Sequence, residues 1–184
     1  MTFRLPVRVT IAIVLVLLAG SAASAQQKPT NDLAISWGLL AESENTMPLG
    51  WVVASTSHIN ERVSFVAEFG GNYKTVESLG VNVTLSEHSF LGGVRFRPAP
   101  SSKVTPFIQA LLGVARVGGG ASVAGFDVNV SKNMFAIQPG GGVDIEVAKN
   151  TAVRIQGDLR VLTGDYGTNQ FRLAMGIVFG FGGK

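Results

Sequence analysis

The last stretch of the chain, NQFRLAMGIVFGFGGK, alternates between large apolar residues and residues that are small or polar. Because successive side chains of a β-strand point to opposite faces, this alternation predicts a strand with one continuous apolar face. The apolar positions are Phe171, Leu173, Met175, Ile177, Phe179 and Phe181. Such a face must be covered by a protein core or by lipid, and this requirement restricts the fold more than any other feature of the chain.

The same alternation recurs along the chain and predicts eight strands. They lie at about 33–42, 49–58, 63–74, 88–97, 104–117, 133–147, 152–162 and 169–181. Some connections are short and carry turn-forming residues, as in RPAPSSK and AKNT. The links at 75–87 and 118–132 are longer and rich in Gly, Ser, Asn and Thr. Short turns at one rim and long loops at the other are typical of an outer-membrane barrel, whose short turns and chain ends lie in the periplasm.

The first 25 residues have the layout of a cleaved secretory signal. Two arginines precede an apolar run, and the small residues Ala23 and Ala25 form an A-x-A cleavage site. An uncleaved membrane anchor is the alternative, but the apolar run is short for a spanning helix. The sequence therefore predicts a signal peptide at 1–25 and one exported domain at 26–184.

The alternation alone fits both a soluble barrel with its apolar face inside and an outer-membrane barrel with that face against lipid. Three features favour the membrane: charges of both signs on the presumed inner faces, aromatic residues near strand ends, and small inner residues that leave space in a narrow lumen. The charges expected in the lumen are Glu68, Arg95, Arg97, Asp144, Glu146, Arg154, Asp158, Arg160 and Arg172. Because buried charges are costly unless paired, we expect ion pairs that fill the lumen, with a gated pore as the alternative.

Composition excludes several other classes of protein. The chain has no cysteine, which rules out a disulfide framework and a thiolate metal site. Its formal charge is +3, and the two signal arginines account for two of these, so about +1 remains, too little for a nucleic-acid footprint. The mean hydropathy of +0.33 is high for a soluble surface. We expect no metal, no cofactor and no nucleic-acid partner.

Two local features qualify this interpretation. Pro139 interrupts a predicted strand and cannot donate to the ladder, so we expect it near the outer rim, at a bulge. His88 and Ser89 are the strongest candidates for catalysis, but adjacent residues of a strand point to opposite faces and cannot pair. The sequence therefore predicts no catalytic residue.

The end of the chain resembles the C-terminal signal that the assembly machinery of bacterial outer membranes recognises. Gly176, Phe179 and Phe181 match its spaced glycine and alternating aromatic residues, whereas Ala174 takes the usual polar position and GGK follows the last aromatic residue. Over residues 26–184 the chain resembles the small barrels of the opacity-protein and outer membrane protein A or X type. This resemblance implies an all-β fold, an eight-stranded antiparallel transmembrane β-barrel in the outer membrane of a Gram-negative-type bacterium.

The resemblance also implies partners and a role. The expected partners are outer-membrane lipid, the barrel-assembly machinery, periplasmic chaperones and an extracellular ligand at the loops. We expect a non-enzymatic protein with a structural or surface-interaction role, carried by the links at 75–87 and 118–132. A narrow pore for ions or small solutes is the main alternative, and a secreted soluble barrel that holds a hydrophobic ligand is a third.

Overall fold

The computed structural model describes residues 29–42, 45–78, 81–100, 103–123, 126–164 and 167–182, and the expected signal peptide lies outside them. The strands are β1 (Asn31–Glu42), β2 (Asn45–Met47), β3 (Leu49–His58), β4 (Val63–Ser78), β5 (Val81–Phe96), β6 (Val104–Val123), β7 (Phe126–Ala148), β8 (Thr151–Thr163) and β9 (Asn169–Phe181). In the described ranges, no helix is long and apolar enough to cross a membrane.

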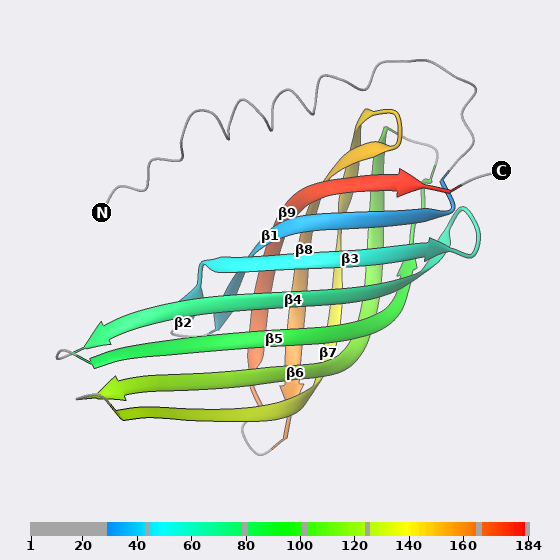
Figure 1. Cartoon of the computed structure of the whole chain (residues 1–184). Helices are drawn as coiled ribbons and strands as arrows, with labels where there is room; N and C mark the ends of the chain where they lie inside the picture. The colour runs from blue at the N-terminus through cyan, green and yellow to red at the C-terminus, as the bar shows by residue number, and fades with distance from the viewer. Residues whose placement is uncertain are drawn as a thin grey trace, which may run out of the picture.

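The eight long strands form a closed antiparallel barrel (Figure 1). Each pairs with its neighbours in chain order, and β9 closes the sheet against β1 with partners from Asn31↔Phe181 to Glu42↔Gln170. The predicted eight-stranded antiparallel barrel is confirmed. The sequence did not predict β2, a short strand that folds back on the outer end of β1.

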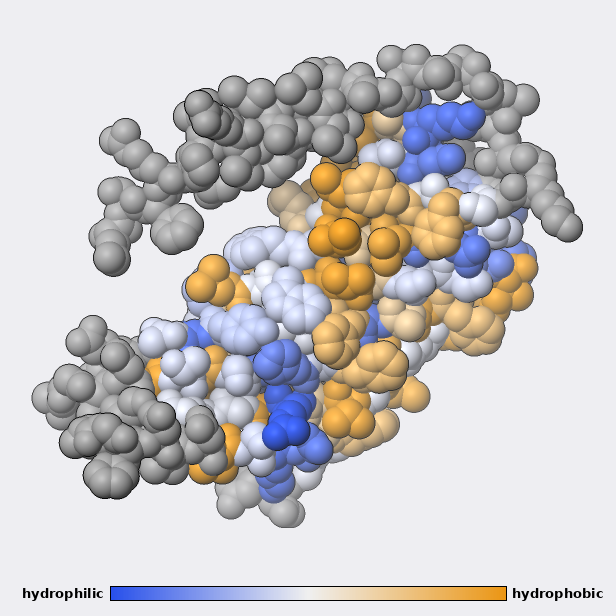
Figure 2. Space-filling model, viewed as in Figure 1, coloured by the Kyte–Doolittle hydropathy of each residue, from blue (hydrophilic) through white to orange (hydrophobic). Residues whose placement is uncertain are grey.

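The outward face of the barrel is apolar, whereas the inward face carries charged, polar and small residues and a buried cluster of larger apolar side chains that includes Leu91, Leu111 and Leu162. In β9, Phe171, Leu173 and Met175 are exposed, while Arg172 and Ala174 between them are buried. Outward side chains of the long strands form an apolar belt around the barrel, and the orange region of Figure 2 is the part of this belt on the face in view. The exposed side chains of the belt include Ile35, Phe65, Phe90, Ile108, Leu112, Leu159 and Met175. Apolar surface of this extent is not tolerated in water, so the belt is built to face lipid.

The rim where β1 begins and β9 ends carries the short turns, as the sequence predicted. Lys149 and Asn150 join β7 to β8, and Asn150 has a φ of 58°, a left-handed conformation that asparagine tolerates. In the turn from β3 to β4, the Asn60 side-chain oxygen accepts hydrogen bonds from the backbone N–H groups of Arg62 and Val63. We refer to this rim as the periplasmic rim.

The links at 75–87 and 118–132 are not loops, and this corrects the prediction. β4 and β5 stay paired as far as Ser78↔Val81, and β6 and β7 as far as Val123↔Phe126. β5 and β6 also stay paired, up to Asn82↔Ser122. The two hairpins therefore form one four-stranded sheet that extends beyond the barrel (Figure 1). We call residues 74–78, 81–86, 117–123 and 126–132 the protruding sheet.

Pro139 also differs from the prediction. It lies on the outward face beside Ala110 of β6, between the belt pairs Leu112↔Ile137 and Ile108↔Gly141, and not at the outer rim. The β7–β8 pairing stops after Ile137↔Val161 and resumes in the same register at Gly140↔Asp158. Because proline has no N–H to donate, the ladder opens locally and no bulge forms there.

Candidate functional site

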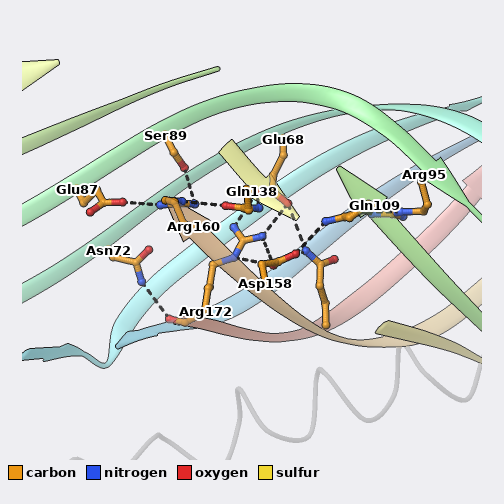
Figure 3. A network of polar contacts seen from close by, with 12 residues as sticks. Glu68, Asn72, Glu87, Ser89, Arg95, Gln109, Gln138, Asp158, Arg160 and Arg172 are labelled. Carbon is orange, nitrogen blue, oxygen red and sulfur yellow. Dashed lines mark hydrogen bonds and ion pairs between the residues drawn. The ribbon is translucent and has the colours of Figure 1, made fainter. Parts of the chain in front are cut away.

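The centre of the lumen is a cluster around Arg172 of β9. Its guanidinium donates to the two carboxylate oxygens of Glu68 at 2.7 and 2.9 Å, and to Asp158 Oδ2 at 2.6 and 3.0 Å. Glu68 belongs to β4, across the lumen from β8 and β9, which carry Asp158 and Arg172 (Figure 3). All three residues are at most 1% exposed. Paired carboxylates on both sides of the guanidinium compensate its buried charge.

A second layer lies towards the outer end of the lumen and is centred on Arg160 of β8. Arg160 forms an ion pair with Glu87 and donates to Gln138 Oε1 at 2.8 Å and to Ser89 Oγ at 3.1 Å. Gln138 in turn donates to Glu68 at 3.1 Å, and Figure 3 shows how this amide joins the two layers. The network is therefore continuous from one layer to the next.

Arg95 of β5 is held by an amide and by an aromatic ring. Its guanidinium donates to Gln109 Oε1 at 2.6 and 3.0 Å and lies 4.2 Å from the centre of the Phe107 ring. Gln109 donates to Asp158 at 3.1 Å, which links Arg95 to the central cluster. Among the residues that the structure describes, none forms a hydrogen bond with the buried Nη1 atom of Arg95. The positive charge of Arg95 is thus compensated through Gln109 and the ring, not by a directly bound carboxylate.

A third layer closes the lumen towards the periplasm. Arg154 and Asp144 form a two-bonded pair at 2.7 and 2.9 Å, and Arg97 donates to Asp32 at 2.8 Å. A cavity of about 690 Å³ lies between this layer and the short turns. Its lining includes Asp32, Arg97, Asp144 and His58.

His58 also joins an acid to a hydroxyl, an arrangement that the sequence did not predict. Its Nε2 lies 3.0 Å from Asp32 Oδ2 and its Nδ1 lies 2.7 Å from Ser64 Oγ. Ser64 has no exposed surface, so the hydroxyl offers no accessible nucleophile. We interpret these contacts as structural.

The network fills the barrel at its middle. Arg95, Arg160, Arg172, Glu68 and Asp158 are 0–1% exposed, so no path as wide as a water molecule passes them. The buried or nearly buried charges balance, with Arg95, Arg97, Arg154, Arg160 and Arg172 facing Asp32, Glu68, Glu87, Asp144 and Asp158. An eight-stranded barrel is narrow enough for its own side chains to occupy the lumen.

The structure places eight of the nine charges named from the sequence in this network, and the ninth, Glu146, elsewhere. Glu146 is exposed at the periplasmic rim, where the pairing shifts register between Glu146 and Ala148, and it lines the mouth of the cavity. The predicted set of lumen charges did not include the inward residues Asp32, Glu87 and Gln170, nor Gln109, Gln138 and Gln156, although the alternation places these last three on the inner face. Two of them, Asp32 and Glu87, lie just before the predicted strands, and the glutamines carry no charge. Extending the alternation by one residue and counting amides would have identified them.

The predicted assembly residues lie towards the end of β9. Phe179 and Phe181 point outward and are exposed, near the periplasmic rim. A Cβ on Gly176 would lie 2.1 Å from the backbone oxygen of Ile35, so β9 requires glycine there. In the part of the chain that the structure describes, no group of His, Cys, Asp or Glu could hold a metal ion.

Comparison with known proteins gives a likeness of fold only. No protein-family model matches the chain, and no curated protein matches its sequence. Neisserial surface protein A is 14% identical with a TM-score of 0.61, covering 82% of this chain and 96% of its own. A major outer membrane protein from Thermus thermophilus is 10% identical with a TM-score of 0.61, covering 82% and 99%. Ail, the attachment invasion locus protein of Yersinia pestis, is 14% identical with a TM-score of 0.57, covering 84% and 100%.

These structures share the small-barrel fold, and the surface of the present barrel gives independent physical grounds for its location. Exposed apolar side chains surround the barrel, while its charges are paired inside. That arrangement is the inverse of a soluble barrel and is typical of outer-membrane barrels. The protein is an outer-membrane β-barrel.

Proposed function

We propose that this outer-membrane barrel is a non-enzymatic surface-interaction protein that binds its partner through the protruding sheet. The observation that carries the proposal is a reversal of polarity along β4–β7. Inside the barrel, the inward face carries the charged network and a buried apolar cluster, and the outward face is apolar. In the protruding sheet, the face continuous with the lumen carries apolar side chains together with Lys74 and Lys132, and the opposite face carries hydroxyl side chains.

Four apolar side chains lie on the inner face of the protruding sheet, and Lys74 and Lys132, the partners of Leu85 and Val117, lie on the same face. Leu85 and Val130 flank Gly119 in cross-strand register, and Val83 and Val117 lie on the same face. Val130 is 69% exposed. The opposite face carries Thr75, Thr84, Ser86 and Ser131. An exposed apolar face above the membrane is unfavourable in water unless a partner covers it.

The protruding sheet also has two edges at which backbone pairing ends. The β3–β4 pairing ends at Leu49↔Tyr73, while β4 continues to Ser78. The β7–β8 pairing begins at Phe135↔Thr163, while β7 begins at Phe126. Edge strands offer backbone donors and acceptors to an added strand. The chemistry therefore suits an extended peptide segment with alternating apolar side chains.

A similar fold binds a ligand in one comparison protein. Ail has been solved in complex with the heparin analogue sucrose octasulfate, a sulfated sugar. The inner face of the protruding sheet carries four apolar side chains beside its two lysines, and its edge strands can pair with an added strand, so we propose a protein segment as the partner of this chain and not a polyanion. Another protein with a similar fold, Neisserial surface protein A, is named as a surface protein.

Two alternatives have less support. A narrow pore requires an open lumen, but the side chains around Arg172 are almost completely buried. Catalysis by His88 and Ser89 requires that they meet, but Ser89 contacts Arg160 in the lumen, whereas His88 contacts Tyr73 on the outward face.

The test is a peptide selection against the folded protein in lipid nanodiscs. We expect a random dodecapeptide library to yield peptides with alternating apolar residues that bind the wild type and not empty nanodiscs. Val130→Asp should weaken these peptides at least about tenfold, because burying a valine contributes about 1.5–3 kcal/mol. Thr84→Asp, on the polar face, is the matched control and should have little effect. No enrichment over empty nanodiscs, or equal binding to the Val130→Asp variant, would contradict the proposal.

A further inference from the structure

The outer boundary of the apolar belt is sharp on the outward face of β4–β7. The last apolar row consists of the cross-strand partners Phe69, Phe90, Val114 and Phe135. The next row outward consists of Gly71, His88, Arg116 and Asn133. Figure 2 shows the change as a stripe of hydrophilic residues beside the orange belt. The second row thus lies one step beyond the lipid-facing side chains, at the level expected for lipid headgroups.

Arg116 is the cation of this row. It is exposed, and its Nη2 donates to Ser131 Oγ at 2.8 Å. Ser131 stands in the following row outward, so this contact directs the guanidinium away from the hydrocarbon. Asn133, the cross-strand partner of Arg116, is also exposed. A long arginine side chain can lie along apolar surface while its charged end stays at the interface.

His88, the cross-strand partner of Arg116 on β5, contacts Tyr73, which in turn contacts Trp51. Its Nε2 lies 2.9 Å from Tyr73 Oη, and Trp51 Nε1 donates to the same oxygen at 3.4 Å. Gly71 makes this approach possible, because a Cβ there would lie 2.8 Å from Trp51 Nε1 and 2.9 Å from Tyr73 Oη. Tyr73 Oη can donate its hydrogen to Nε2 while it accepts from Trp51, and in that tautomer the imidazole carries its hydrogen on Nδ1. In that tautomer the Nδ1–H group of His88 is a second donor in the same row as Arg116, its cross-strand partner.

We propose that Arg116 and His88 bind a phosphate group on the headgroup of an outer-leaflet lipid. A guanidinium and an imidazole N–H are suitable donors for a phosphate. The two rows beyond the belt contain no acidic residue that would repel it. The first row is Gly71, His88, Arg116 and Asn133, and the second is Tyr73, Ser86, Gly118 and Ser131. The occupant is a lipid because the row continues directly into the belt, where Phe90, Val114 and Phe135 would contact its acyl chains. Trp51 and Tyr73 lie at the interface, where aromatic residues are favoured.

The test uses bisphosphorylated lipid A as the probe and native mass spectrometry of the folded barrel in mixed micelles. We expect Arg116→Gln to weaken lipid A binding about fivefold, the effect of about 1 kcal/mol for one cation near a membrane surface. Arg62→Gln removes the same charge from the exposed periplasmic turn and should leave binding unchanged. Removing the phosphates from lipid A should abolish the difference between the wild type and Arg116→Gln. Heat-modifiable gel mobility will show that both variants fold.

Three results would overturn the proposal. Equal lipid A binding by the wild type and Arg116→Gln would exclude a role for the guanidinium. An equal loss in Arg116→Gln and Arg62→Gln would show a general charge effect and no site. Displacement of lipid A by an excess of inorganic phosphate would show a site for the free anion and not for the lipid.

Discussion

Replacing Arg172 with methionine is expected to lower the free energy of unfolding of the barrel by about 3–5 kcal/mol, the usual effect of removing one partner from a buried ion pair. The substitution leaves Glu68 and Asp158 buried without the guanidinium that both contact. Their mutual repulsion and their desolvation then act against folding. Urea titration of the protein in lipid vesicles, followed by heat-modifiable gel mobility, measures the change.

The matched control is Arg62→Met, which removes an arginine from an exposed turn at the periplasmic rim. Surface substitutions away from buried networks usually change stability by no more than about 0.5 kcal/mol. A loss below about 1 kcal/mol in Arg172→Met, similar to the control, would mean that water reaches the two carboxylates and that the lumen is open.

The second large effect is expected on the opposite face. Ile108 is 62% exposed, in the middle of the outward apolar positions of β6. An arginine on the lipid face of a barrel costs about 2–4 kcal/mol at the midplane and about 0–1 kcal/mol near the interface. We therefore expect Ile108→Arg to destabilise the folded protein by about 2–4 kcal/mol in vesicles.

Thr75→Arg is the control for this effect, since Thr75 is exposed in the protruding sheet, beyond the belt. The same urea titration should detect a change of at most about 1 kcal/mol in this variant. If Ile108→Arg and Thr75→Arg are equally tolerated, the apolar belt does not face hydrocarbon and the membrane interpretation fails.

The fold was predictable because its strongest determinant is local. In the strands that cross the membrane, one face contacts lipid and the other faces a charged lumen. The polarity of a residue therefore indicates which face of the strand its side chain is on. The alternation of β9 continues through its whole length, and the predicted range 169–181 coincides with the observed strand. β2 was missed because three residues are too few to display a period.

The protruding sheet was not predictable in the same way. Its residues alternate as strands do, but their composition is rich in Gly, Ser, Asn and Thr, which is typical of loops. The polarity of its faces also reverses beyond the belt, so the pattern inferred for the membrane no longer applies. Only the pairing between β5 and β6 shows that the two hairpins form one surface.

For the candidate residues too, the local alternation predicts the face on which a side chain lies but not the residues that it contacts. The inward position of Glu68 follows from its parity in the strand, but its meeting with Arg172, 104 positions away in the chain, depends on closure of the barrel. Glu146 has the same parity and pairing register as Asp144, yet it lies at the rim because it stands near the end of β7, beyond the layer that closes the lumen. The assembly role of Gly176, Phe179 and Phe181 and the cleavage after Ala25 remain predictions from the sequence.

The most direct test of the central claim, a closed barrel whose function lies outside the lumen, is single-channel recording. Folded protein is inserted into a planar bilayer, and insertion is verified independently by gel mobility of the recovered protein. We predict a silent bilayer, because the residues around Arg172 leave no water-wide path. Discrete conductance steps that change when Arg154 or Asp158 is neutralised would contradict the account and identify the protein as a pore.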